Sequence, residues 1–199
     1  MKVLVIGDSC KDKFIYGKCE RICPEATVPV FNPVNQVTNG GMTKNVFSNL
    51  KSLAPKWTID LITNDQQISK TRLVDIKTNQ MLVRIDENDT CARVPNVTSL
   101  GHYDAVVISD YNKGFLHKKD IEILLDKYPL SFIDSKKIFG DYIKKASFIK
   151  ISPRSASFFA KVSSLLSSSL KKRIFSNNKT SPGFNLLEAS IALESILSR

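Results

Sequence analysis

The sequence predicts an α/β fold with a mostly parallel sheet, flanking helices and a small separate β element. Short β-branched apolar runs recur along the first three quarters of the chain, and segments with helical spacing separate them. Strands that alternate with helices in this way are typical of a doubly wound sheet. With 199 residues and 42% hydrophobic content, the chain is long enough to bury a core without disulfides or a structural metal.

The strands of the main sheet are expected where apolar runs end in a turn. The first is Lys2–Ile6, which Gly7 and Asp8 close. Helices are expected over 42–53 and 117–127, where apolar residues recur at helical spacing. The other strands of the main sheet are expected at 57–62, 104–109, 131–134 and 147–151.

Two stretches break this alternation and predict a β lid. Residues 26–38 carry valines among prolines, and 71–86 read as a hairpin that turns at Thr78-Asn79. A hairpin alone is only marginally stable, so it has to cover something. A lid over a ligand cleft and a dimer contact are the two interpretations.

The expected organisation is a first part, 1–152, and a divergent tail, 153–199. The first part includes the lid, at about 14–38 and 71–95. The tail is basic and rich in serine, and apolar spacing predicts a terminal helix over 184–197. The sheet is expected to be incomplete at its C-terminal edge.

The net charge of +10 fits nucleic acid, an anionic membrane or a phosphorylated small molecule. Nucleic acid is not favoured, because no aromatic side chains are interleaved with the basic cluster 171–173 and no known binding motif accompanies it. The N-terminal apolar run is too short for a signal peptide and no long apolar run follows, so a cytoplasmic location without membrane contact is expected. The four cysteines form no C-x-x-C pair and lie far from both histidines, so no metal site is expected.

Three segments carry candidate site residues. Gly40 and Gly41 precede an expected helix, where free N–H groups suit an oxygen-rich ligand and Asn45 can bind a hydroxyl; a tight loop with Asn45 as a helix cap is the alternative. Asp8 and Asp12 follow the first strand, at the edge where open α/β sheets bind ligands. Asp110 and Lys113 follow a later strand, where a lysine can hold a phosphate. Ordinary turns are the alternative for these two segments.

Together these segments resemble the ribokinase-like (PfkB) carbohydrate kinases. Within that family they are most similar to heptose 7-phosphate kinases that form half of a bifunctional kinase/adenylyltransferase. The resemblance covers about residues 2–151 and is carried by several motifs. These are Val5-Ile-Gly-Asp8 with Asp12, Arg21-Ile-Cys-Pro-Glu-Ala-Thr-Val-Pro-Val30, Gly40-Gly41-Met-Thr-Lys-Asn45-Val46, the hairpin from Thr71 to Asp86, and Ser109-Asp110-Tyr111-Asn-Lys113-Gly114.

The resemblance implies ATP-dependent phosphoryl transfer, with Mg²⁺, to a sugar phosphate such as heptose 7-phosphate. It assigns Asp12, Gly40, Gly41 and Asn45 to the substrate, places Asp110 and Lys113 on the phosphate or nucleotide side, and allows a homodimer through the lid. Such kinases also need a late G-A-G-D motif, whose amides stabilise charge and whose Asp acts as base. The nearest stretch here puts Phe184 where that base belongs, so the catalytic residues are unknown. A non-catalytic sugar-phosphate-binding protein and a truncated kinase remnant are therefore the alternatives.

Overall fold

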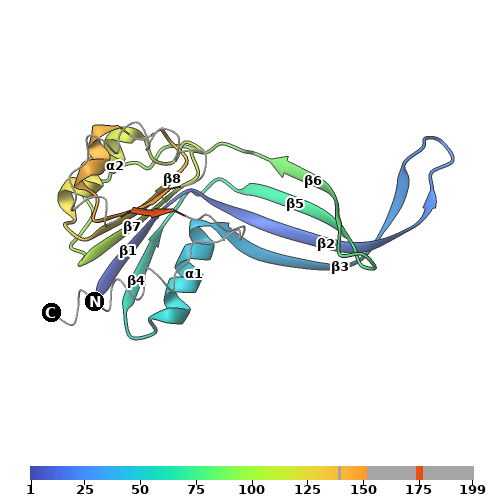
Figure 1. The fold of residues 1–199 in the computed structure, drawn as a ribbon, viewed down its shortest axis with the longest axis horizontal. Coiled ribbons are helices and arrows are strands. Elements are labelled where there is room, and N and C mark those ends of the chain that lie inside the picture. The colour runs from blue at the N-terminus through green and yellow to red at the C-terminus, as the bar shows by residue number, and fades with distance from the viewer. Residues whose placement is uncertain (139, 152–173, 177–199) are drawn as a thin grey trace.

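The structure, a computed structural model, describes residues 1–138, 140–151 and 174–176. Figure 1 shows an α/β body from which a long β lid projects to one side. The body contains a six-stranded sheet in which all strands are parallel. Its strand order is β10 (Ile174–Ser176), β9 (Phe148–Ile151), β8 (Ser131–Ser135), β7 (Ala105–Asp110), β1 (Lys2–Gly7) and β4 (Thr58–Ile62).

Helices α1 (Thr43–Leu53) and α2 (Lys118–Lys127) cover opposite faces of this sheet. Alternate residues of β1 supply the two faces, because side chains alternate along a strand. Val3 and Val5 pack with Val46 and Leu50 of α1, whereas Leu4 and Ile6 lie in the cluster that contains Ile121 and Leu124 of α2. Burial on both faces explains why β1 is a continuous apolar run. A short 3₁₀ helix, Asp141–Lys145, precedes β9.

The lid is a four-stranded sheet with mixed strand directions. Its outer pairs are antiparallel and its central pair is parallel. The first two strands in sequence have fourteen residues each and extend beyond the other two as a two-stranded arm (Figure 1). The strand order is β3 (Pro29–Met42), β2 (Ser9–Ile22), β5 (Ile68–Asp75) and β6 (Met81–Glu87).

The predicted fold class is confirmed, and each expected strand and helix of the body is present within a residue or two. The lid strands differ from the expected ranges: β2 already begins at Ser9, and residues 88–95 lie outside any strand. The sequence did not predict β2 because lysines and cysteines interrupt its apolar pattern. It also did not predict β10, which lies within the expected tail. The expected terminal helix at 184–197 and the basic cluster 171–173 lie outside the described residues.

No helix in the described ranges is long and apolar enough to cross a membrane.

Candidate functional site

The candidate site lies at the carboxyl ends of β1 and β7. The strand order reverses here, because the chain continues from β1 to β4 on one side while β7 lies on the other. Open α/β sheets bind ligands outside the strand ends at such a point. The lid starts at the same edge, since β2 begins two residues after β1 ends.

Asp8 directly follows β1 and holds the loop that follows β7. Its buried carboxylate accepts hydrogen bonds from the Tyr111 N–H at 2.6 Å and the Phe115 N–H at 3.2 Å. Burial, with a smaller contribution from the nearby Asp110 charge, raises the pKa of Asp8. Asp8 therefore positions the 111–115 loop from inside the protein.

Asp110 and Lys113, which the sequence placed on the phosphate or nucleotide side, both have protein partners. The Asp110 carboxylate is buried and accepts hydrogen bonds from Lys137 Nζ at 2.6 and 2.8 Å and from Ser135 Oγ. Lys113 Nζ forms an ion pair with Asp89, in the segment that returns from the lid. In this structure Asp110 makes contacts within the body, and Lys113 connects the body to the segment that returns from the lid.

Gly41 and Asp12 lie against each other at the start of the lid. A Cβ added to Gly41 would lie 2.0 Å from Asp12 Oδ2 and 2.6 Å from Cys10 Sγ, so only glycine fits here. The next residue, Met42, has φ 56°, and Thr43 begins α1 with its Oγ1 bonded to the carbonyls of Asp8 and Ser109. The double-glycine loop thus ties the lid to the body.

The first turn of α1 has no side-chain cap, although the Thr43 N–H already donates to the Asp8 carbonyl. The absence of a side-chain cap rules out Asn45 in that role. Asn45 and Gly40 are both exposed, close in sequence to the Gly41–Asp12 contact. The structure thus places Asp12 and Gly41 together and presents Gly40 and Asn45 on the surface beside them.

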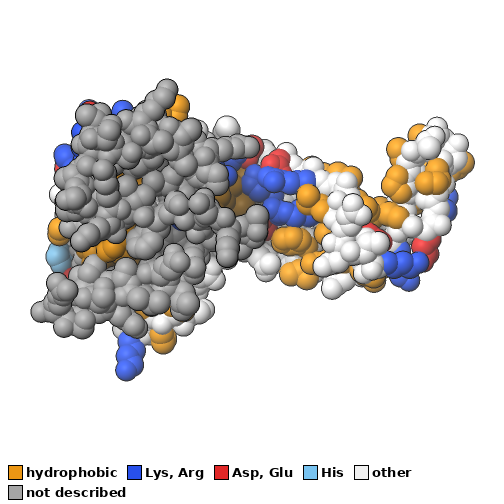
Figure 2. Space-filling view, viewed as in Figure 1, with side chains coloured by type: hydrophobic (Ala, Val, Ile, Leu, Met, Phe, Trp, Pro, Cys, Tyr) orange, Lys and Arg blue, Asp and Glu red, His pale blue; other side chains and the backbone are white. Residues whose placement is uncertain are grey.

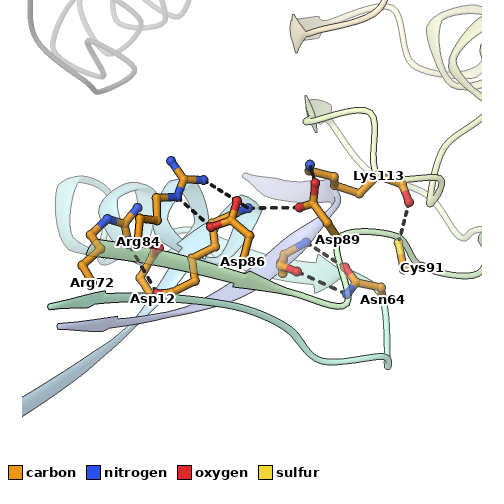
Figure 3. Close-up of polar contacts among 10 residues, drawn as sticks. Asp12, Asn64, Arg72, Arg84, Asp86, Asp89, Cys91 and Lys113 are labelled. Carbon is orange, nitrogen blue, oxygen red and sulfur yellow. Dashed lines mark hydrogen bonds and ion pairs between the residues drawn. The ribbon is translucent and has the colours of Figure 1, made fainter. Parts of the chain in front are cut away.

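Charged residues of β5 and β6 were not singled out as site residues by the sequence. Arg72 Nη1 donates to Asp12 Oδ1 at 2.6 Å, and the buried Lys70 Nζ lies 3.1 Å from both Asp86 and Asp89 (Figure 3). Their only signal in the sequence is a basic residue at alternate positions of a predicted hairpin. Such a pattern also fits a solvated strand, so register was needed to place these side chains beside Asp12.

No family model matches the chain. Two curated relatives are the bifunctional proteins HldE of Campylobacter fetus subsp. fetus (strain 82-40) and of Helicobacter pylori (strain HPAG1). The first is 29% identical over 192 residues, covering 77% of this chain and 41% of the relative. The second is 30% identical over 193 residues, covering 78% and 41%. The chain therefore spans about two fifths of the length of these relatives.

Among solved structures, a putative phosphofructokinase from Staphylococcus aureus matches with a TM-score of 0.53. The sequence identity is 10%, and the match covers 81% of this chain and 62% of the other. At this identity the match establishes the fold alone. The chain thus has a ribokinase-like fold. In sequence it is related to the bifunctional HldE proteins.

Proposed function

We propose that this chain is a carbohydrate kinase-like protein that binds a sugar phosphate beside Asp12, Gly40, Gly41 and Asn45 and phosphorylates it with ATP and Mg²⁺. The observation that carries this proposal is the Gly41–Asp12 contact at the base of a lid, next to an uncapped helix start. Heptose 7-phosphate is the first candidate acceptor, because the sequence relatives are HldE proteins and the motifs resemble heptose 7-phosphate kinases.

Each of these residues has a distinct task in the proposed complex. The Asp12 carboxylate, which is partly exposed, accepts a hydrogen bond from a sugar hydroxyl. Gly41 lets the backbone approach the sugar, and Asn45 can both donate to and accept from a second hydroxyl. Free N–H groups in the first turn of α1 favour the oxygen atoms of the ligand.

The described part of the chain offers fewer candidate residues for ATP, the phosphate donor, than for the sugar phosphate. Among these residues, no three or more His, Cys, Asp or Glu side chains come together as a metal site. Lys113 remains our candidate for the phosphate or nucleotide side, with Asp110 holding its loop; to contact a phosphate, Lys113 would have to leave Asp89. No step is assigned to Mg²⁺.

A second candidate function is sugar-phosphate binding without catalysis. It is supported by the sequence between Asp141 and Glu188, which contains no acidic residue and puts Phe184 where related kinases have their base. A phenyl ring cannot accept the proton of a sugar hydroxyl. Removing a general base typically costs a factor of about 10² to 10⁴ in rate.

We also propose that the lid mediates a homodimer. Apart from Leu53 and Ile138, every large apolar side chain exposed in the described residues lies on the lid or its turns. An apolar surface of this kind marks an interaction site in a soluble protein. The side chains are Ile22, Val28, Val34, Val37, Ile76, Met81, Leu82, Val83 and Ile85.

The proposed function is tested by calorimetric binding of heptose 7-phosphate, followed by ATP turnover with Mg²⁺. Asn45→Ala should weaken sugar-phosphate binding by about a factor of ten, since it removes hydrogen bonds to a hydroxyl. The matched control is Asn49→Ala, an exposed asparagine one turn further along α1, which should bind as the unaltered protein does.

Binding with turnover would support the kinase, and binding without turnover would support the second candidate. If heptose 7-phosphate does not bind, or if Asn45→Ala and Asn49→Ala bind it equally well, the proposed substrate site is wrong.

A further inference from the structure

Two arginines face each other across the lid hairpin. Arg72 of β5 and Arg84 of β6 are register partners in the antiparallel pair. Like charges at directly opposed positions destabilise a sheet, because their side chains lie on the same face at close range. The opposed arginines therefore lower the stability of the lid, and this cost points to a role in binding a ligand.

Neither guanidinium group is free to swing away. Arg72 donates to Asp12 Oδ1 at 2.6 Å and lies over the Phe14 ring, 4.9 Å from its centroid. Arg84 donates to both oxygens of Asp86 at 2.7 Å. Both groups are therefore oriented before any ligand arrives, which lowers the entropy cost of binding.

Hydrogen-bond donors remain on both groups. Only Nη1 of Arg72 is engaged, and Arg84 uses Nε and Nη2 on Asp86. Within the described residues, Nε and Nη2 of Arg72 and Nη1 of Arg84 have no protein acceptor. In Figure 3 the guanidinium groups of Arg72 and Arg84 lie next to each other on the same side of the lid. Planar guanidinium groups with unused N–H donors can bind the oxygens of a phosphate.

The net charge on this face of the lid also favours binding of an anion. This face of the lid carries three cations, Lys70, Arg72 and Arg84, against two carboxylates, Asp12 and Asp86. Adding the ion pair between Asp89 and Lys113 does not change the excess of one positive charge. Figure 2 shows the basic side chains gathered where the lid leaves the body.

Asp12 connects this arginine pair to the proposed sugar site. Its carboxylate bonds to Arg72 on one side and packs against Gly41 on the other. The raised pKa of Arg84 comes mainly from its hydrogen bonds to Asp86, and the charge of Asp12 adds a smaller contribution. A ligand with a hydroxyl at Asp12 would place a neighbouring substituent at the arginines.

We propose that Arg72 and Arg84 bind the phosphate that the sugar substrate already carries. The inference rests on the proposed function and adds to it the residues that distinguish a sugar phosphate from a free sugar. The bound phosphate takes hydrogen bonds from the spare donors of both groups, while Asp12 and Asp86 keep the guanidinium groups in place.

The experiment compares the binding of heptose 7-phosphate with that of the same heptose without phosphate, by calorimetry in the absence of nucleotide. The unaltered protein should bind the phosphorylated sugar more tightly. Arg84→Gln should weaken that binding by roughly ten- to a hundredfold and leave the affinity for the free heptose unchanged. Arg84→Lys, which keeps the charge but loses the fork, should fall in between. Inorganic phosphate should compete with heptose 7-phosphate in the unaltered protein and less in Arg84→Gln.

The matched control is Arg93→Gln. Arg93 also forms a two-bond contact with an aspartate, Asp120, and its side chain is 47% exposed against 44% for Arg84, but it lies on the body. This variant should bind both sugars normally. Equal affinity of the unaltered protein for the two sugars, or equal losses in Arg84→Gln and Arg93→Gln, would overturn the inference and leave the sugar site standing. If neither sugar binds, the proposed function fails and the inference with it.

Discussion

At the scale of single residues, Asp8 determines the shape of the site from beneath. Both oxygens of its carboxylate accept backbone N–H groups, from Tyr111 and Phe115. An asparagine has one acceptor and would turn an NH₂ donor toward one of these N–H groups. Asp8→Asn should therefore lower the free energy of unfolding by about 1–3 kcal/mol, measured by urea denaturation, because a buried amide loses its partner. Relief of the repulsion from Asp110 acts in the opposite direction and reduces this loss.

Asp104→Asn is the control for this prediction. The Asp104 carboxylate also accepts a backbone N–H, that of Lys2 at 2.6 Å, but its side chain is 48% exposed, so water can replace the lost acceptor. Its effect should stay within about 0.5 kcal/mol. Equal effects of the two substitutions would show that the buried contacts of Asp8 do not hold the loop.

At the scale of elements, the β5–β6 hairpin should be sensitive to acid. Hydrogen bonds from Arg84 lower the pKa of Asp86 from 3.8 to about 2, and the contact with Lys113 lowers that of Asp89. Groups whose folded pKa is lowered contribute stability above the unfolded pKa, and that stability is lost as the pH falls through the folded value. The hairpin should thus weaken as the pH falls from about 4 toward about 2.

Amide hydrogen exchange over 68–87 at about pH 5 and about pH 2.5, corrected for intrinsic rates, measures this effect. Asp86→Asn should reduce protection at the higher pH and flatten the pH dependence. Asp126→Asn removes a body carboxylate paired with Lys145 and should leave the hairpin unchanged. Protection of 68–87 that does not depend on pH would contradict the prediction.

At the scale of the whole molecule, the exposed apolar side chains of the lid predict a dimer. Val83→Glu would place a charge in that interface and should convert the dimer to a monomer, because burying an unpaired carboxylate is costly. Sedimentation of the unaltered protein and the variant measures the change. Leu53→Glu is the control, since Leu53 has the same exposed fraction, 48%, but lies on α1 of the body. A monomeric unaltered protein, or equal loss of dimer in both variants, would contradict the proposed interface.

The sequence predicted the body well because its elements are locally encoded. Lys2–Ile6 and 104–109 are apolar on both faces, which occurs in the buried strands of parallel sheets, and the two helices have clear apolar spacing. The lid was predicted as a β element, but β2, one of its two fourteen-residue strands, was not predicted as a strand. Cys10, Gly17 and several lysines break its alternation, and one of its two partners, β5, is distant in sequence.

The candidate site was predicted in part. The glycine pair, Asp12 and Asn45 come from short motifs, and the contact between Asp12 and Gly41 follows from β2–β3 register that local patterns do not specify. Asp110 and Lys113 were expected to face a phosphate, yet the structure engages both with protein partners. Whether a ligand displaces Asp89 from Lys113 remains a prediction.

By itself the sequence determined the α/β class, the strands of the body and the residue types at the edge of the sheet, because hydrophobic periodicity and glycine spacing are local properties. The tertiary structure decided which side chains meet. Arg72 reaches Asp12 and faces Arg84 only because β5 pairs with β2 and β6 in one particular register. A shift by one residue would turn each of these side chains to the other face of the lid. Register depends on contacts between distant segments, and this is why the arginine pair could be recognised only in the folded protein.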